Sequence, residues 1–144
     1  MTKKNLFLIL TAIALGAVYV IYFTDWFRPK TVQIFHTYRN LRPRIQREGV
    51  LSALNFGISR QLRLTDLKVV SLLAWQTNKN ALPVWHLISN SNSVPVKQFF
   101  YGQYIGGMKP AVQGVRSQPL ETNVTYRLFI TAGNVIGQHD FELK

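Results

Sequence analysis

The side chains that most often carry out chemistry in proteins are few in this chain of 144 residues, and they lie far apart. The three histidines, His36, His86 and His139, have no partner at the i, i+2 or i, i+4 spacing that metal ligands adopt on one strand or helix. A lone histidine on a strand usually serves packing or faces solvent. We therefore expect no metal site.

The carboxylates do not suggest a catalytic pair either. After the first 30 residues the acids are Glu48, Asp66, Glu121, Asp140 and Glu142, which are too scattered for general acid–base work. The chain has no phosphate-binding glycine loop, no nucleophile elbow around a serine, and no cysteine for a disulfide or a thiolate zinc site. The sequence predicts a protein that has no catalytic residues and no cofactor, and that is not an enzyme.

The best candidate for a ligand or partner surface is a polar and aromatic stretch in the middle of the chain. Asn90 and Asn92 lie in a loop-like run, and Phe100 and Tyr104 follow among other aromatic residues. Since side chains alternate along a strand, one aromatic pair can stay exposed. Exposed aromatics beside amides suit a sugar or a peptide. The alternative is that all of these aromatics serve packing.

Positive charge is concentrated near the N-terminus, although the net charge of the whole chain is +11. Residues 28–63 hold eight basic residues and one acid, whereas residues 64–144 hold seven basic and four acidic residues. The candidate contacts with an anionic surface are Arg39, Arg42, Arg44 and Arg47. Each would contribute about 1 kcal/mol near anionic lipid. A solvated spacer is the alternative.

The elements that would position these residues are short strands. The candidate strands are residues 54–58, 61–71, 82–89, 97–105, 111–116, 124–132 and 137–143, with a further short strand possible at 31–38. Turn residues separate them, and no convincing amphipathic helix occurs among them. Strand 124–132 alternates most cleanly, with Phe129 as the one apolar residue on its polar face. The pattern predicts an antiparallel β-sandwich of about seven strands that ends in a hairpin.

A motif resemblance supports the sandwich. The segment Leu120–Tyr126 resembles the tyrosine corner of fibronectin type III and related immunoglobulin-like domains, in which a tyrosine that opens the penultimate strand bonds back to the backbone. This resemblance implies that Leu120 and Tyr126 are folding residues. The segments WHLISNSNSVP, FFYGQ and GMKPA are also similar to segments of small bacterial membrane proteins with a single span, and that likeness implies no activity.

Residues 5–23 carry no ionisable charge and are apolar on all sides. As a helix they would be roughly 28 Å long, which matches the hydrocarbon core of a bilayer. Lys3 and Lys4 precede the segment, and aromatic residues follow it. We predict a transmembrane signal anchor in contact with the lipid bilayer. A cleaved signal peptide is the alternative, although no good cleavage site follows a full-length apolar region.

These features give one membrane-attached domain. The expected parts are a cationic tail (1–4), a transmembrane helix (5–23), a basic juxtamembrane stalk (24–53) and an immunoglobulin- or fibronectin III-like β-sandwich (54–144). A short cationic tail resists translocation, so we expect the C-terminal domain outside the cytoplasm, although the basic residues after the span favour the opposite orientation.

The function that we expect is non-enzymatic. The domain would be a binding or scaffolding module at the cell envelope, in contact with another envelope protein or a polymer. The alternative is a structural accessory subunit of a membrane complex. A binder of acidic polymer or nucleic acid would be favoured only if the domain were cytoplasmic, and we expect no nucleic acid.

Overall fold

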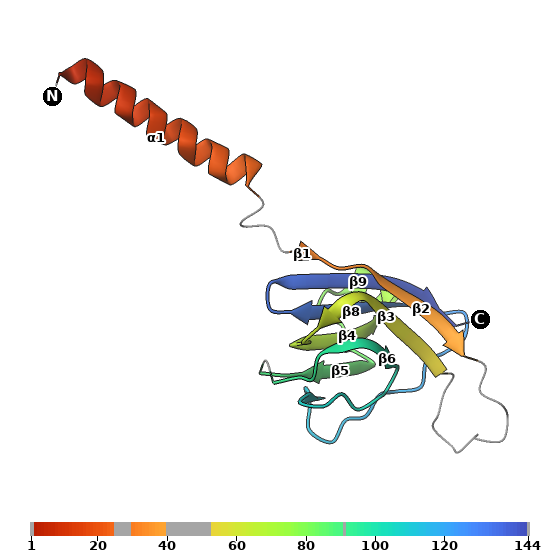
Figure 1. Ribbon diagram of the computed structural model, residues 1–144. Coiled ribbons are helices and arrows are strands. Elements are labelled where there is room, and N and C mark those ends of the chain that lie inside the picture. Colours follow the sequence, from red (N-terminus) through yellow and green to blue (C-terminus); the bar gives the residue numbers. More distant parts are fainter. Residues whose placement is uncertain (1, 25–29, 40–52, 91, 144) are drawn as a thin grey trace.

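The computed structural model describes residues 2–24, 30–39, 53–90 and 92–143, apart from the side chains of Arg39 and Ala53. The elements are α1 (Lys3–Phe23), β1 (Lys30–Thr31), β2 (Ile34–Arg39), β3 (Ala53–Leu62), β4 (Asp66–Ser71), α2 (Leu72–Thr77), β5 (Trp85–Ile88), β6 (Val96–Phe100), β7 (Lys109–Pro110), β8 (Thr125–Ala132) and β9 (Val135–Glu142). The protein is therefore mainly β with an apolar helix at its N-terminus, as the sequence predicts (Figure 1).

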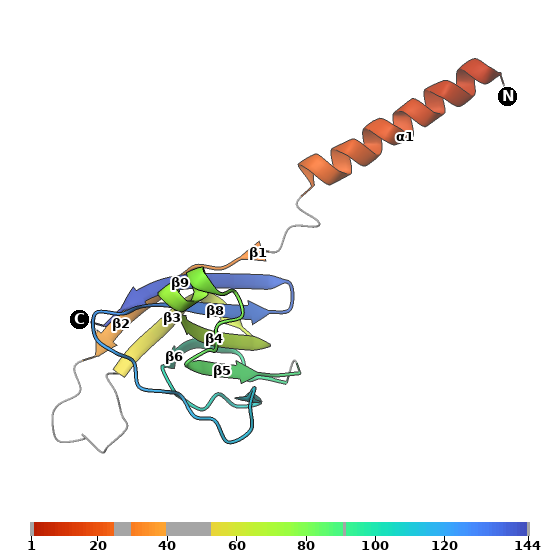
Figure 2. The same cartoon turned by 180° about the vertical axis from the view of Figure 1, so that it is seen from behind.

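The helix α1 has no buried residue, and it stands apart from the strands in Figures 1 and 2. It is long and apolar enough to cross a membrane, a property that it shares with signal sequences. Its one mid-helix hydroxyl is satisfied internally, since Oγ1 of Thr11 donates to the carbonyl of Phe7 at 2.9 Å. Such internal pairing is what a polar group needs in lipid.

The strands form two sheets. The large sheet has the order β1-β9-β8-β4-β5-β7, and the small sheet has the order β2-β3-β6. All neighbours are antiparallel except β1 and β9, which run parallel. The chain thus passes from the large sheet (β1) to the small sheet (β2) within residues 32–33, at one edge of both sheets.

One hydrophobic core fills the space between the two sheets. Phe56 of β3 contacts Phe99 and Phe141, with ring centres 5.5 Å and 5.0 Å apart. Because Phe56 belongs to the small sheet and Phe141 to the large one, these rings join the sheets across the core. Trp85 of β5 adds a contact with Phe99 at 6.2 Å. The arrangement is consistent with a β-sandwich.

The terminal hairpin matches its prediction. β8 and β9 pair from Thr125↔Glu142 to Ala132↔Val135, around a turn in which Gly133 takes a φ of 62°. Positive φ suits glycine, which has no Cβ to clash with the backbone. Burial alternates along β8, with Tyr126, Leu128 and Ile130 facing the core.

The loop before β8 closes on the same tyrosine. The backbone N–H of Glu121 donates to the hydroxyl oxygen of Tyr126 at 3.0 Å, and Leu120 and Tyr126 are both buried. Between them Asn123 has a φ of 59°, a left-handed conformation that asparagine accepts more readily than most residues. The bond fixes the path of the chain into β8.

Four segments differ from the predicted elements. Residues 30–39, expected in the stalk, pair with β9 and β3 and belong to the sheets. The predicted strand 61–71 is broken at 63–65, where the chain crosses from β3 in the small sheet to β4 in the large one. The predicted strand 97–105 ends at Phe100, before a turn in which Gly102 has a φ of 74°.

The fourth difference lies around residues 109–116. The predicted strand 111–116 is absent, since β7 covers only Lys109–Pro110 and residues 111–116 contain no strand. Proline cannot donate to a ladder, and a turn at Gly114, with a φ of 82°, follows. The described residues also contain a second helix, α2, which the sequence did not predict. It is a single six-residue helix that ends where the N–H of Asn78 donates to the carbonyl of Ala74 at 2.8 Å.

Candidate functional site

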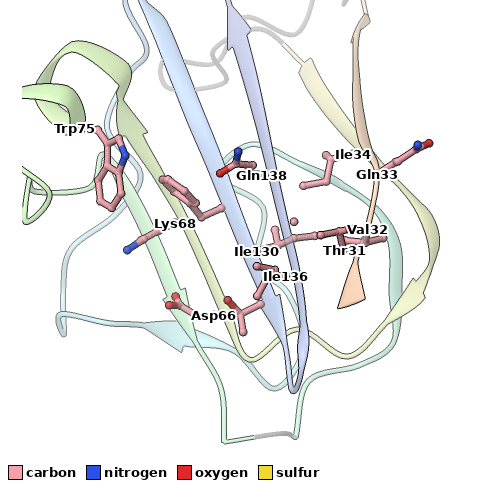
Figure 3. Close-up of a pocket in the computed structure, with 13 residues that line it drawn as sticks. Thr31, Val32, Gln33, Ile34, Asp66, Lys68, Trp75, Ile130, Ile136 and Gln138 are labelled. Atoms are coloured by element: carbon pink, nitrogen blue, oxygen red, sulfur yellow. The ribbon is translucent and has the colours of Figure 1, made fainter. Parts of the chain in front are cut away.

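A groove of about 780 Å³ lies on the outer side of the large sheet. Figure 3 shows it along β8 and β9, with Trp75 and Lys68 on one side and Thr31, Val32 and Ile34 on the other. The lining residues are Thr31, Val32, Gln33, Ile34, Asp66, Lys68, Trp75, Phe129, Ile130, Thr131, Ile136, Gly137 and Gln138. The groove is thus bounded by α2 on one side and by the crossing from β1 to β2 on the other.

The sheet places three groove residues in one row. Lys68 of β4 lies opposite Phe129 of β8, and Phe129 lies opposite Gln138 of β9. Residues that are paired in this way point to the same face. A cation, an aromatic ring and an amide are therefore held side by side by the backbone register.

The helix α2 adds a second aromatic ring. Trp75 lies with its ring centre 4.9 Å from that of Phe129. The ammonium of Lys68 lies 5.3 Å from the Trp75 ring centre and 5.4 Å from the Phe129 ring centre, and the ammonium of Lys79 lies 4.9 Å from that of Trp75. These are cation–π distances, so two lysines are held beside one aromatic pair.

The opposite wall of the groove is tightly packed. A Cβ on Gly137 would lie 2.7 Å from Cγ1 of Val32 and 3.0 Å from side-chain carbons of Ile34 and Ile130. The absence of a side chain at Gly137 therefore lets the β1–β2 crossing lie directly on β9. Ile136, next to it, leaves 42% of its surface exposed in the groove.

Two ion pairs flank the aromatic pair on the outer face. Nε2 of His86 lies 2.8 Å from Oδ1 of Asp66. Arg127 makes a two-pronged contact with Asp140, with Nε–Oδ1 at 2.6 Å and Nη2–Oδ2 at 2.7 Å. The hydrogen bond from Arg127, together with its charge, holds the pKa of Asp140 below the ordinary value. Both carboxylates therefore have cationic or donor neighbours, which leaves the lysines as the notable charges beside the rings.

Two of the three histidines, which are far apart in sequence, meet in the structure. Nδ1 of His36 on β2 lies 2.6 Å from Nε2 of His139 on β9. His86 lies apart from them on the outer face of the large sheet, where it pairs with Asp66. Within the described ranges no three His, Cys, Asp or Glu side chains are grouped as a metal site would require.

The predicted surface residues do not form one site. Asn90 and Asn92 are exposed and line a hollow of about 250 Å³ with Gly107. Tyr104, 77% exposed, lines a separate hollow of about 260 Å³. The segments between these hollows are joined by a bond from the N–H of Val94 to the carbonyl of Gly106 at 2.9 Å.

The remaining predicted surface residues are Phe100 and four arginines. Phe100 is 36% exposed at the end of β6 and lines neither hollow. Arg39 lies in β2, but its side chain, and all of Arg42, Arg44 and Arg47, lie outside the described residues.

Sequence reasoning missed the groove residues Lys68, Trp75 and Gln138. One signal was available: Phe129 breaks the alternation of its strand by placing an aromatic ring on the polar face. Trp75 of α2 lies beside that ring, and α2, with six residues, is too short to show a helical periodicity in the sequence.

Comparison with protein-family models, with curated proteins and with solved structures found no match to this chain. The functional inference therefore depends on the geometry of the molecule. The groove offers aromatic surface, cations and amides without an arranged nucleophile–base pair, and this set of groups is suited to binding.

Proposed function

We propose that this protein is a membrane-anchored binding module of the cell envelope, and that its ligand site is the groove beside α2. The observation that carries the proposal is the Trp75–Phe129 pair with the ammonium of Lys68 over both rings, at 5.3 Å and 5.4 Å. Aromatic rings with a few convergent polar groups in a concave surface are typical of ligand sites.

The anchor in this proposal is α1. Its length and apolar surface suit a bilayer, and the short tail with Lys3 and Lys4 favours an N-in orientation. The domain then lies outside the cytoplasm. The groove would face envelope polymers or other envelope proteins.

We further propose that the domain is an immunoglobulin-like sandwich related in architecture to fibronectin type III. Three features support this. The small sheet is formed by β2, β3 and β6, while β5, β4, β8 and β9 are neighbours in the large one. Tyr126 opens the penultimate strand, and its hydroxyl oxygen is bonded to the N–H of Glu121. Such a scaffold presents a rigid sheet face on which the groove residues are held in register.

The chemistry of the groove favours an acidic saccharide as its ligand. The apolar faces of a sugar ring stack on aromatic side chains, and here Trp75 and Phe129 supply two. Lys68 and Lys79 would attract a carboxylate or phosphate on the sugar, and the amide of Gln138 would bond to its hydroxyls. An acidic sugar would bring its own negative charge to these two ammonium groups, and a neutral sugar would not.

The test is a binding measurement on the full chain in nanodiscs of zwitterionic lipid. The probes are an oligogalacturonate hexamer and cellohexaose, a neutral sugar of equal ring count. We expect the acidic probe to bind and the neutral probe to bind at least about tenfold more weakly, which is 1.4 kcal/mol. Trp75→Ala should weaken the acidic probe about tenfold, and Lys68→Met should reduce the salt dependence of binding.

The matched control is Tyr104→Ala, which removes an exposed aromatic ring outside the groove. It should leave binding unchanged. If Tyr104→Ala weakens binding and Trp75→Ala does not, the ligand lies on the hollow near Tyr104 and the proposed site is wrong. Equal binding of both probes would contradict the acidic ligand.

A further inference from the structure

The edge at which the two sheets meet is held together by side chains. β2 belongs to the small sheet and β9 to the large one, and the two run beside each other after the β1–β2 crossing. The last backbone bond of the crossing runs from the N–H of Val32 to the carbonyl of Ile136 at 3.0 Å. Beyond it, Ile34 packs over Gly137, and the described polar contacts between β2 and β9 come from the side chains of His36 and Tyr38.

Both contacts depend on a titratable group of β2. Nδ1 of His36 lies 2.6 Å from Nε2 of His139, with ring centres 4.9 Å apart. Two residues further on, the hydroxyl of Tyr38 donates to the backbone carbonyl of Glu142. Tyr38 also lies edge-on to His36 at 5.4 Å, so the two contacts support each other.

A hydrogen bond between two imidazoles needs one proton between the facing nitrogens. One ring must donate and the other must accept. If both rings are protonated, both nitrogens are donors and two positive charges lie in contact. The bond is then replaced by repulsion in a half-buried site, where charges are poorly screened.

Charged groups lie near the pair on β9 and on β8. On β9, Asp140 and Glu142 line the same hollow as His36 and Tyr38, a space of about 520 Å³. On β8, Arg127 pairs with Asp140 and thereby offsets its charge. On β3, Phe56 lies opposite His36, and Gly57 and Asn55, which lie opposite its two strand neighbours, carry no charge. Asp140 is therefore the nearest group that favours a protonated His139.

Burial outweighs that carboxylate. Burial, and then the neighbouring His36, hold the pKa of His139 below its ordinary value, while Asp140 acts in the opposite direction. Folding therefore favours the unprotonated form of His139. Stability from the closed pair is complete above about pH 6.5, the ordinary value for histidine, and is lost as the pH falls through the lowered pKa.

We propose that the His36–His139 pair is a pH-sensitive clasp, which holds β2 against β9 at neutral pH and releases β2 when both rings are protonated. β2 follows α1 and the two-residue strand β1 in the chain, so release loosens a strand that lies close to the membrane anchor in sequence. The central ladder of β4, β8 and β9 keeps its backbone bonds. His36 and His139 do not line the ligand groove, although Ile34 at the start of β2 does.

The experiment is amide hydrogen exchange on the full chain in nanodiscs at pH 7.5 and pH 5.5, corrected for intrinsic exchange. We expect the protection of β2 amides to fall about tenfold at the lower pH, because an opening that takes up one proton becomes tenfold more favourable with each pH unit. The protection of β8 amides should be unchanged. His139→Leu, which can neither donate nor accept a hydrogen bond, should give low β2 protection at both pH values. His86→Leu, a matched change at the histidine outside the clasp, should keep the wild-type response.

A second measurement needs no variant. The ring shifts of His139 in the wild-type chain should titrate below the ordinary histidine value, because burial and the neighbouring His36 lower its pKa. A His139 titration at or above the ordinary value, or β2 protection that is equal at both pH values, would overturn the clasp. So would a rise in β2 protection on adding Zn²⁺ at pH 7.5 that His139→Leu abolishes, since it would assign the pair to a metal.

Discussion

The backbone N–H of Glu121 donates a 3.0 Å hydrogen bond to the hydroxyl oxygen of Tyr126, five residues later, and thereby ties the loop before β8 to the first buried ring of that strand. Tyr126 also stacks on Phe141 of β9, with ring centres 5.8 Å apart. A single residue thus links the loop, β8 and β9. The linkage can be tested by removing the hydroxyl group of Tyr126.

Tyr126→Phe deletes the hydroxyl and keeps the ring. The half-buried N–H of Glu121 then loses its partner, and we expect the free energy of unfolding to fall by about 1–3 kcal/mol. Urea denaturation of the full chain in detergent measures the change. Tyr104→Phe, at an exposed tyrosine, should change it by less than about 0.5 kcal/mol. Equal effects of the two variants would show that the bond at Glu121 adds nothing specific.

Gly137→Ala tests the packing of the β1–β2 crossing on β9. The new methyl would lie 2.7 Å from Cγ1 of Val32, so we expect a loss of about 1–3 kcal/mol from overpacking. The double variant with Val32→Ala removes the opposing carbon. It should lose less stability than the sum of the two single variants, because the clash is absent. If the losses of the two single variants simply add, the β1–β2 crossing moves away from the new methyl without cost.

The ion pair of Arg127 and Asp140 sets a pH window of its own. The hydrogen bond from Arg127 lowers the pKa of Asp140, so the contribution of the pair is present above about pH 4 and is lost as the pH falls further. The two side chains are 24% and 41% exposed, so this contribution should be below about 1 kcal/mol. Denaturation of wild type and Arg127→Gln should show a difference at pH 7 that disappears by pH 3. A difference that persists at pH 3 would assign the effect of Arg127 to packing.

The terminal hairpin and the core side of β8 were predictable because strand periodicity is strong there. Alternation from Val124 to Ile130, followed by the turn residues Gly133 and Asn134, specifies both the strand and its partner. The apolar run at 5–23 was equally clear, since helix geometry and bilayer thickness need no tertiary contacts.

The pairing of β2, the His36–His139 contact and the groove depend on contacts between residues that are distant in sequence. A short strand was possible at 31–38 from its alternation, but these residues were assigned to the stalk, because the pairing with β3 that stabilises β2 leaves no local signal. The meeting of His36 and His139 across 103 positions likewise follows from the sheet arrangement and leaves no trace in local spacing. The groove was missed because Trp75 comes to it from α2, a helix of six residues with no period to read.

Orientation of the chain is open to direct measurement. With the N-terminal lysines retained inside, a reporter fused after Lys144 should lie outside the cytoplasm. Alkaline phosphatase should therefore be active at that position, and a fluorescent protein that folds only in the cytoplasm should be dark. The reverse pattern would place the domain in the cytoplasm and favour a binder of acidic polymer or nucleic acid.

The most direct test of the proposed function is to map the ligand on the protein. Nuclear magnetic resonance spectra of the full chain in nanodiscs would be recorded during titration with the oligogalacturonate hexamer. The account predicts shifts at the Trp75 indole and at the amides of Lys68 and Gln138, on α2, β4 and β9 around the groove. Shifts confined to Asn92 and Tyr104, or none at saturating probe, would contradict it.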